Sequence, residues 1–196
     1  LVGMEFLYLV RLGLRRADDP RILDSLKVAE ALLRVETPQG VAYRRYNGDG
    51  YGDLLVGALY HDNGELDEGA AFLYQGSPAG LSSTPVWSAE ANQVITYFGV
   101  DVASGDVNGD GYSVMMIVAY EYDFDQNNDG AVFIYHGSPS GLPASPSLVL
   151  HGPEAGFSLG GSVDTGDVNG DGFDDLLTSS LLFSNGEPRE GAGFLY

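Results

Sequence analysis

The chain has 196 residues, a formal net charge of −19 and no cysteine, which excludes disulfides, thiolate metal sites and cysteine nucleophiles. Residues 1–46 hold 8 basic and 6 acidic residues, a net of 8 − 6 = +2. Residues 47–196 hold 1 basic and 22 acidic residues, a net of 1 − 22 = −21. An acidic surface of this kind repels nucleic acid and anionic membrane, so we expect neither as a partner and expect cations as ligands.

The segment 1–46 is predicted to be helical. Asp18-Asp19 as an acidic N-cap, proline in the first turn and apolar residues on one face predict a helix that ends near Thr37-Pro38. Residues 4–14 predict a second helix, and the two form an N-terminal helical pair. The apolar start, 1–10, is too short to span a bilayer, so we expect no membrane insertion.

Residues 18–53 read DDPRILDSLKVAEALLRVETPQGVAYRRYNGDGYGD and resemble part of the helical barrel of glucoamylase-type glycoside hydrolases. The resemblance spans residues 1–53 at most and ends at Asp53, where that family has glutamate. Neither catalytic glutamate of the family has a counterpart here. We therefore interpret 1–46 as a helical remnant of such a barrel, or as a junction of two coding segments, with a hydrolase role as the alternative.

The sequence from Asn47 onward is a tandem repeat. Asn-Gly-Asp-Gly occurs at 47–50, 108–111 and 169–172, and Gly-Ala-x-Phe-x-Tyr occurs at 69–74, 130–135 and 191–196. Both motifs recur with a period of 61 residues, which indicates repeated units that bury their apolar faces against one another.

Each period contains four short strand patterns separated by Gly, Pro, Asn and Asp. In the middle repeat the predicted strands are 98–107, 114–120, 130–137 and 147–152. Four antiparallel strands make one propeller blade. The first repeat lacks its inner strand unless residues 41–46 substitute for it. The third repeat lacks its outer strand. The predicted fold is therefore mainly β, with about two and a half four-stranded antiparallel blades after the helical pair.

Phe98-Gly99, the run Gly105–Gly111 and the strand that follows resemble the FG-GAP repeat of integrin α-subunit β-propellers. The resemblance covers residues 47–196. It implies blades of a seven-bladed ring, with the remaining blades outside this chain, and Ca²⁺ in the hairpin loop between the first two strands of a blade. Because the chain opens on Leu1 rather than Met and stops on strand-like residues, we expect it to be a fragment at both ends.

The third acidic loop has an oxygen-only ligand pattern. Asp167, Asn169 and Asp171 alternate, so a tight loop can turn their side-chain oxygens toward one centre, while Phe173 supplies a carbonyl and Asp175 closes the cage. Such a set suits a hard cation. A twelve-residue EF-hand or dockerin loop, with its cohesin partner, is disfavoured because its twelfth position is Thr178 and a strand follows instead of a helix.

The three loops are not equivalent. The second loop repeats the pattern as Asp106, Asn108, Asp110 and Tyr112. The first loop keeps Asn47, Asp49, Tyr51 and Asp53. Val114 replaces the closing aspartate in the second loop, so we expect weaker binding there. Arg45 takes the leading position of the first loop, so we expect that loop to hold no ion. The alternative for any loop is an Asx-turn hairpin with solvated acids.

The remaining polar and aromatic residues predict no catalysis. His61, His136 and His151 share no triad or metal spacing, and the repeated Tyr74, Tyr135 and Tyr196 are predicted to pack between blades. The acidic turns 65–68 and 123–129 are predicted to be solvated hairpin tips.

We therefore predict a non-catalytic, Ca²⁺-binding FG-GAP propeller fragment, extracellular or on the cell surface. Its blade loops would bind a protein or glycan ligand in adhesion. The alternative is a carbohydrate-active enzyme fragment, either glucoamylase-like or a propeller attached to a hydrolase.

Overall fold

The computed structural model describes residues 34–37, 40–43 and 51–196. These residues form strands and no helix, and among them none is a helix long and apolar enough to cross a membrane. The strands are β1 (Arg34–Thr37), β2 (Gly40–Tyr43), β3 (Leu54–Ala58), β4 (Ala70–Tyr74), β5 (Trp87–Glu90), β6 (Val102–Gly105), β7 (Val114–Ala119), β8 (Ala131–Tyr135), β9 (Leu148–His151), β10 (Leu159–Gly166), β11 (Asp175–Ser180) and β12 (Ala192–Leu195).

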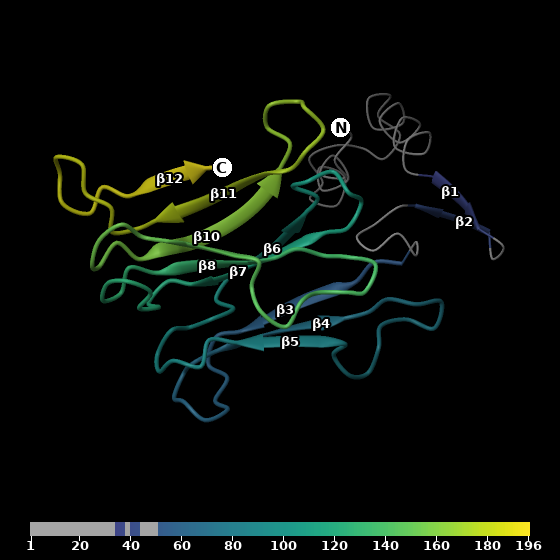
Figure 1. The fold of residues 1–196 in the computed structure, drawn as a ribbon, viewed down its shortest axis with the longest axis horizontal. Helices are drawn as coiled ribbons and strands as arrows, with labels where there is room; N and C mark the ends of the chain where they lie inside the picture. Colours follow the sequence, from purple (N-terminus) through teal and green to yellow (C-terminus); the bar gives the residue numbers. More distant parts are fainter. Residues whose placement is uncertain (1–33, 38–39, 44–50) are drawn as a thin grey trace, which may run out of the picture.

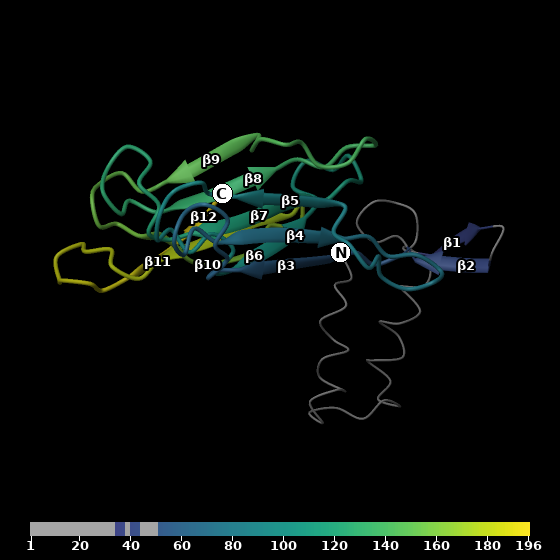
Figure 2. The same ribbon diagram turned by 90° about the horizontal axis from the view of Figure 1, so that it is seen from below.

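Ten of these strands form three antiparallel sheets that lie side by side, as propeller blades do (Figures 1 and 2). We call them blade 1 (β3–β4–β5), blade 2 (β6–β7–β8–β9) and blade 3 (β10–β11–β12). Blade 2 has the predicted four strands and blade 3 lacks a fourth, as predicted from the repeat boundaries. The β-rich, blade-like part of the predicted fold is confirmed.

Two details of the prediction are wrong. Residues 34–37 form a strand instead of the end of a helix, because Val35 and Thr37 are β-branched and Pro38 restricts the residue before it to extended backbone. The partner of β2 is β1, with Thr37 opposite Gly40, so the described part of 41–46 does not supply an inner strand to blade 1. The helical pair predicted within residues 1–33 lies outside the described residues.

Blade 2 is buried on both faces. Its second strand, β7, contributes alternate residues to two apolar clusters, and no residue of β7 is exposed. Met115, Ile117 and Ala119 face blade 1, together with Phe133 and Tyr135. The intervening β7 residues (Val114, Met116 and Val118) face blade 3. Stacking of successive blades on the middle one therefore creates the core, as expected for repeat proteins.

The segment that enters blade 2 crosses close to the backbone of blade 1. Phe98 is fully buried and packs edge-to-face on Phe133, with 5.1 Å between ring centroids. The Gly99 amide donates to Val118 O (2.8 Å), and Gly99 has a φ of +84°, which a side chain would oppose. A Cβ placed on Gly57 of β3 would lie 1.9 Å from Gly99 O. The predicted strand at 98–107 is consequently shorter, since its first residues belong to this crossing.

Adding a methyl group at the crossing should separate blades 1 and 2. We expect Gly57→Ala to lower the free energy of unfolding by about 1–3 kcal/mol, because the new Cβ overlaps the backbone carbonyl of Gly99. Gly52→Ala is the matched control, since a Cβ there meets nothing within 4 Å, and should change stability by less than about 0.5 kcal/mol. Urea unfolding measures both values, and equal effects of the two substitutions would contradict this account.

Tyr135 should make stability fall at alkaline pH. Burial, reinforced by the neighbouring Tyr122 hydroxyl, raises its pKa to about 12. Because the folded-state pKa exceeds the unfolded value of about 10, the contribution of Tyr135 is complete below pH 10 and is lost as pH rises toward 12. Urea unfolding between pH 8 and pH 11.5 should show this loss, and Tyr135→Phe should flatten it. A wild-type slope unchanged by Tyr135→Phe would refute the assignment.

Candidate functional site

The second and third acidic loops occupy the same place in successive blades. Loop 3 (167–175) joins β10 to β11, and loop 2 (106–114) joins β6 to β7. Most of the first loop, including Asn47, Asp49 and Arg45, lies outside the described residues. Of its predicted ligands the structure describes Tyr51 and Asp53, and Asp53 Oδ1 accepts a hydrogen bond from the Gly76 amide (2.9 Å).

Asp167 organises loop 3. Its Oδ1 accepts hydrogen bonds from the amides of Gly170 (2.6 Å) and Asp171 (3.1 Å), and its Oδ2 accepts one from the Gly172 amide (3.0 Å). Partial burial opposes ionisation, but these three amide bonds together outweigh burial and lower the pKa of Asp167. The carboxylate therefore stabilises the loop above its ordinary pKa, and the stabilisation is lost as pH falls through the lowered value.

The other predicted ligands of loop 3 also accept hydrogen bonds from its backbone. Asn169 Oδ1 accepts from the Asp171 amide (2.8 Å) and Asp171 Oδ1 accepts from the Phe173 amide (2.9 Å). Asp175 reaches back across the loop, where Oδ2 accepts from the Val168 amide (2.9 Å) and Oδ1 from Asn169 Nδ2 (3.3 Å). All four polar side chains thus belong to one hydrogen-bonded hairpin.

Loop 2 repeats this arrangement without the closing carboxylate. Asp106 accepts hydrogen bonds from the amides of Gly109 (2.8 Å) and Gly111 (3.0 Å). The Asp110 amide donates to Asn108 Oδ1 (3.1 Å), and the Tyr112 amide donates to Asp110 Oδ1 (2.8 Å). Val114, at the position of Asp175, is fully buried against blade 3.

The donor chemistry of loop 3 fits a hard cation, although its carboxylates do not converge. Throughout the described ranges, no three His, Cys, Asp or Glu side chains gather closely enough to hold a metal ion. The carboxylates Asp167, Asp171 and Asp175 instead face backbone amides, which avoids a repulsion of about 1–4 kcal/mol per pair. A carboxylate offers about four lone-pair sites, so the oxygens of Asp171 and Asp175 keep accepting capacity for an ion. The predicted ligand set stays a prediction.

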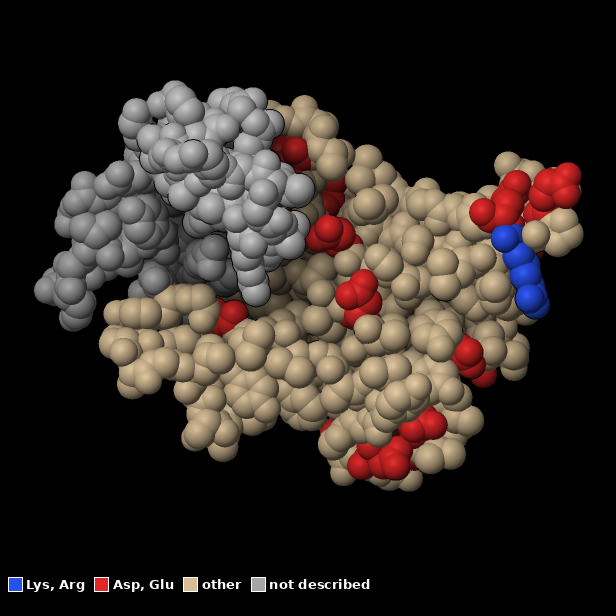
Figure 3. Space-filling model, turned by 180° about the vertical axis from the view of Figure 1, so that it is seen from behind, with Lys and Arg blue, Asp and Glu red and all other residues tan. Residues whose placement is uncertain are grey.

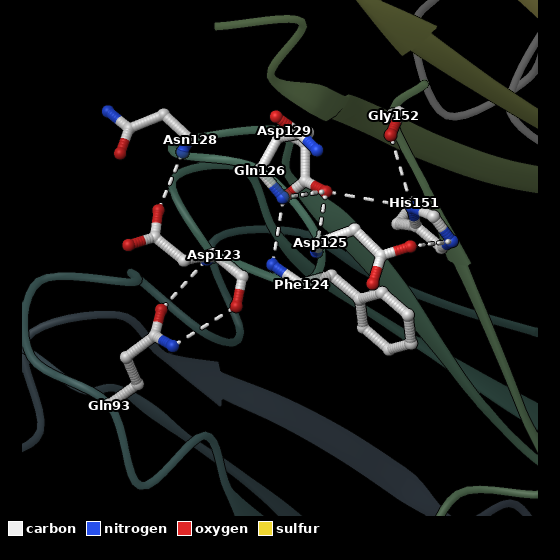
Figure 4. Close-up of polar contacts among 9 residues, drawn as sticks. All are labelled: Gln93, Asp123, Phe124, Asp125, Gln126, Asn128, Asp129, His151 and Gly152. Carbon is white, nitrogen blue, oxygen red and sulfur yellow. Dashed lines mark hydrogen bonds and ion pairs between the residues drawn. The ribbon is translucent and has the colours of Figure 1, made fainter. Parts of the chain in front are cut away.

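Two carboxylates in the acidic turns, which were predicted to be solvated, are buried. Glu68 and Asp129 are buried, with 1% and 0% exposure, whereas Glu65 and Asp125 in the same turns are exposed. Asp129 accepts hydrogen bonds from three amides of its own turn, Phe124 (2.8 Å), Asp125 (3.0 Å) and Gln126 (3.2 Å) (Figure 4). These acids are structural, because each one satisfies donors that its turn leaves unpaired.

A histidine lies beside the buried acid of blade 2. His151 stacks on Phe124, with 4.2 Å between ring centroids, and its Nδ1 lies 3.6 Å from Asp129 Oδ2 (Figure 4). Its Nε2 lies 3.8 Å from Asp125 Oδ2. These contacts form an acid–histidine cluster beside the turn 123–129.

Removing the buried acid of blade 2 should open its turn. We expect Asp129→Ala to lower the free energy of unfolding by about 1.5–3 kcal/mol, because three amides lose a charged acceptor. Asp125→Ala removes an exposed acid of the same turn whose carboxylate makes only a 3.8 Å contact to His151, and it should cost less than about 1 kcal/mol. Urea unfolding and amide hydrogen exchange at 124–126 provide the measurements. Unchanged exchange in Asp129→Ala would show that the carboxylate does not hold the turn.

Electrostatics favour cations over anions around these loops. Figure 3 shows Asp and Glu side chains in several patches on one face, with a single small basic patch. From Asn47 onward Arg189 is the only Lys or Arg in the sequence.

The comparisons with known proteins agree with the repeat. Residues 159–196 match the FG-GAP repeat. Human integrin alpha-7 is 34% identical over 178 residues, which cover 86% of this chain and 14% of that protein. Bovine phosphatidylinositol-glycan-specific phospholipase D is 32% identical over 155 residues, covering 74% of this chain and 18% of that protein.

A second kind of relative is also found. Glucoamylase from Clostridium sp. (strain G0005) is 40% identical over 97 residues, covering 47% of this chain and 14% of that enzyme. The chain thus spans only 14–18% of the length of these three relatives. Three observations lead to the same conclusion: the match over 159–196, the period of 61 residues, and the similarity to integrin over most of the chain. The chain therefore contains an FG-GAP repeat and is similar to integrin α-subunits over most of its length.

Proposed function

We propose that this chain is a non-catalytic, calcium-binding segment of an FG-GAP β-propeller that serves in adhesion. The observation that carries the proposal is loop 3, where Asp167, Asn169, Asp171 and Asp175 lie in one hydrogen-bonded hairpin between two strands. Together with the Phe173 carbonyl they would supply only oxygen ligands. When bound, Ca²⁺ would neutralise the carboxylates and fix the hairpin.

The loops differ in their expected occupancy. Loop 2 has Asp106, Asn108, Asp110 and the Tyr112 carbonyl as its ligands, but buries Val114 where a fifth oxygen would stand. We propose a weaker site there. The first loop, with Arg45 in the leading position, would hold no ion.

The similarity to integrin α-subunits and the buried core between the blades support a role in adhesion. Blade loops at the rim would present variable side chains to a protein or glycan ligand, while the buried core between blades keeps the loops in place. Loop sites of this kind with millimolar or submillimolar affinity suit the extracellular space or the cell surface, where calcium is abundant.

The similarity to a glucoamylase favours a second candidate, a fragment of a carbohydrate-active enzyme. That candidate predicts release of glucose from maltooligosaccharides. We expect none from this chain, and measurable hydrolysis would replace the first proposal.

Calcium should stabilise the chain through loop 3. At 10 mM Ca²⁺, a site with a dissociation constant of about 0.1–1 mM adds about 1.4–2.7 kcal/mol, which raises Tm by about 3–10 °C. Asp175→Asn should remove most of this rise because a charged ligand is lost. Thermal melts with Ca²⁺ and with chelator provide the measurement.

The control is Asp164→Asn, which removes the same charge from an exposed position on β10 whose carboxylate accepts only from the neighbouring Thr165 amide. Its melt should keep the full calcium response. A wild-type Tm that is identical with Ca²⁺ and with chelator would refute the calcium proposal.

A further inference from the structure

Loops 2 and 3 are joined by direct contacts across the interface between blades 2 and 3. Asp174 of loop 3 lies 68 residues after Asp106 of loop 2. The Asp106 amide donates to Asp174 Oδ2 (2.8 Å), and the Asp174 amide donates to Asp106 O (3.0 Å). Asp174 therefore forms hydrogen bonds with both the amide and the carbonyl of Asp106.

The space for this contact depends on a glycine. A Cβ placed on Gly105 would lie 2.7 Å from Asp174 Oδ2, so only a residue without a side chain leaves room for the carboxylate. A second contact accompanies it, because a Cβ on Gly109 would lie 2.4 Å from the Phe173 ring. Two consecutive residues of loop 3 thus pack against the beginning and the middle of loop 2.

One end of this connection, Asp106, is a predicted calcium ligand, and the other, Asp174, lies between two of them. Asp174 stands between Phe173, whose carbonyl is a predicted ligand, and Asp175, the closing carboxylate of loop 3. Asp106 is the leading ligand of loop 2, and its carboxylate holds the amides of Gly109 and Gly111. A loop 3 fixed by an ion would therefore fix the main chain of Asp106 as well.

We propose that calcium binding at loop 3 is transmitted to loop 2 through Asp174, so that the two loops bind calcium with positive cooperativity. Asp174 is a positioning residue in this scheme and is not itself a ligand. The inference rests on the proposed calcium function. It adds that loop 2, which lacks a closing carboxylate of its own, depends on the neighbouring blade for order.

The test follows each loop separately by NMR of backbone glycine amides in the full chain, with Ca²⁺ as the only ligand. Gly109 and Gly111 report on loop 2, and Gly170 and Gly172 report on loop 3. In the wild type the loop 2 amides should titrate at a calcium midpoint no more than a few-fold above that of the loop 3 amides. In Asp174→Ala the loop 3 midpoint should stay within about twofold, while the loop 2 midpoint should rise about 5–10-fold, which is a typical size for coupling between two sites.

Matched variants separate the contact from general charge effects. Asp164→Ala removes an exposed acid of blade 3 that does not touch loop 2, and it should leave both midpoints unchanged. Asp174→Asn keeps an oxygen acceptor for the Asp106 amide and should restore most of the coupling. If Asp174→Ala does not fold, Asp175→Asn tests the same coupling, since it weakens calcium binding at loop 3 without altering Asp174. It should raise the loop 2 midpoint by a similar factor.

Failure of the coupling and failure of the calcium proposal give different results. If Gly170 and Gly172 titrate but the loop 2 midpoint is the same in the wild type, Asp174→Ala and Asp175→Asn, the loops are independent and the coupling is refuted while calcium binding stands. If Gly170 and Gly172 do not respond to calcium, both proposals are refuted.

Discussion

The stacking of blades depends on one recurring backbone contact, in which the segment entering a blade donates to a carbonyl in the turn of the blade before. The Phe98 amide donates to Glu68 O (3.2 Å), and one period later the Leu159 amide donates to Asp129 O (2.9 Å). Glycines follow both carbonyls, at 69 and 130, with φ of +76° and +73°. A Cβ at either glycine would lie 2.1–2.5 Å from the crossing backbone, so the two chains meet without side chains between them.

That contact explains why the turns contain buried acids. The residue whose carbonyl receives the next blade also carries the carboxylate that holds its own turn, since the Asn63 amide donates to Glu68 Oε1 (2.7 Å) and the Phe124 amide donates to Asp129 Oδ1 (2.8 Å). Glu190 makes the same kind of contact in blade 3, where it is exposed. The acid is therefore buried where the segment entering the next blade covers it, whereas its hydrogen bonds are made within its own turn.

The repeat and its strands could be predicted from the sequence because they follow from local patterns. The strands predicted at 114–120, 130–137 and 147–152 agree with β7, β8 and β9 to within two residues at each end. The buried acids could not be predicted in this way, because a carboxylate in a Gly-rich acidic turn looks the same whether or not a segment 30 residues later covers it. Spacing likewise predicts the oxygen donors of loop 3, but spacing alone does not determine whether they converge on one point.

The unequal loops show how one repeat position can serve either core packing or hydrogen bonding within its loop. At this position loop 2 has Val114, fully buried between blades 2 and 3, and loop 3 has Asp175, half-buried and bonded to its own loop. A valine there adds to the apolar core but gives the loop no oxygen acceptor. Loop 2 therefore lacks the hydrogen bonds that Asp175 accepts in loop 3. The carboxylate of Asp174 supplies a hydrogen bond to loop 2 from the neighbouring blade. A neighbouring blade can thus supply a hydrogen-bond acceptor to a loop in which a core residue replaces the closing carboxylate.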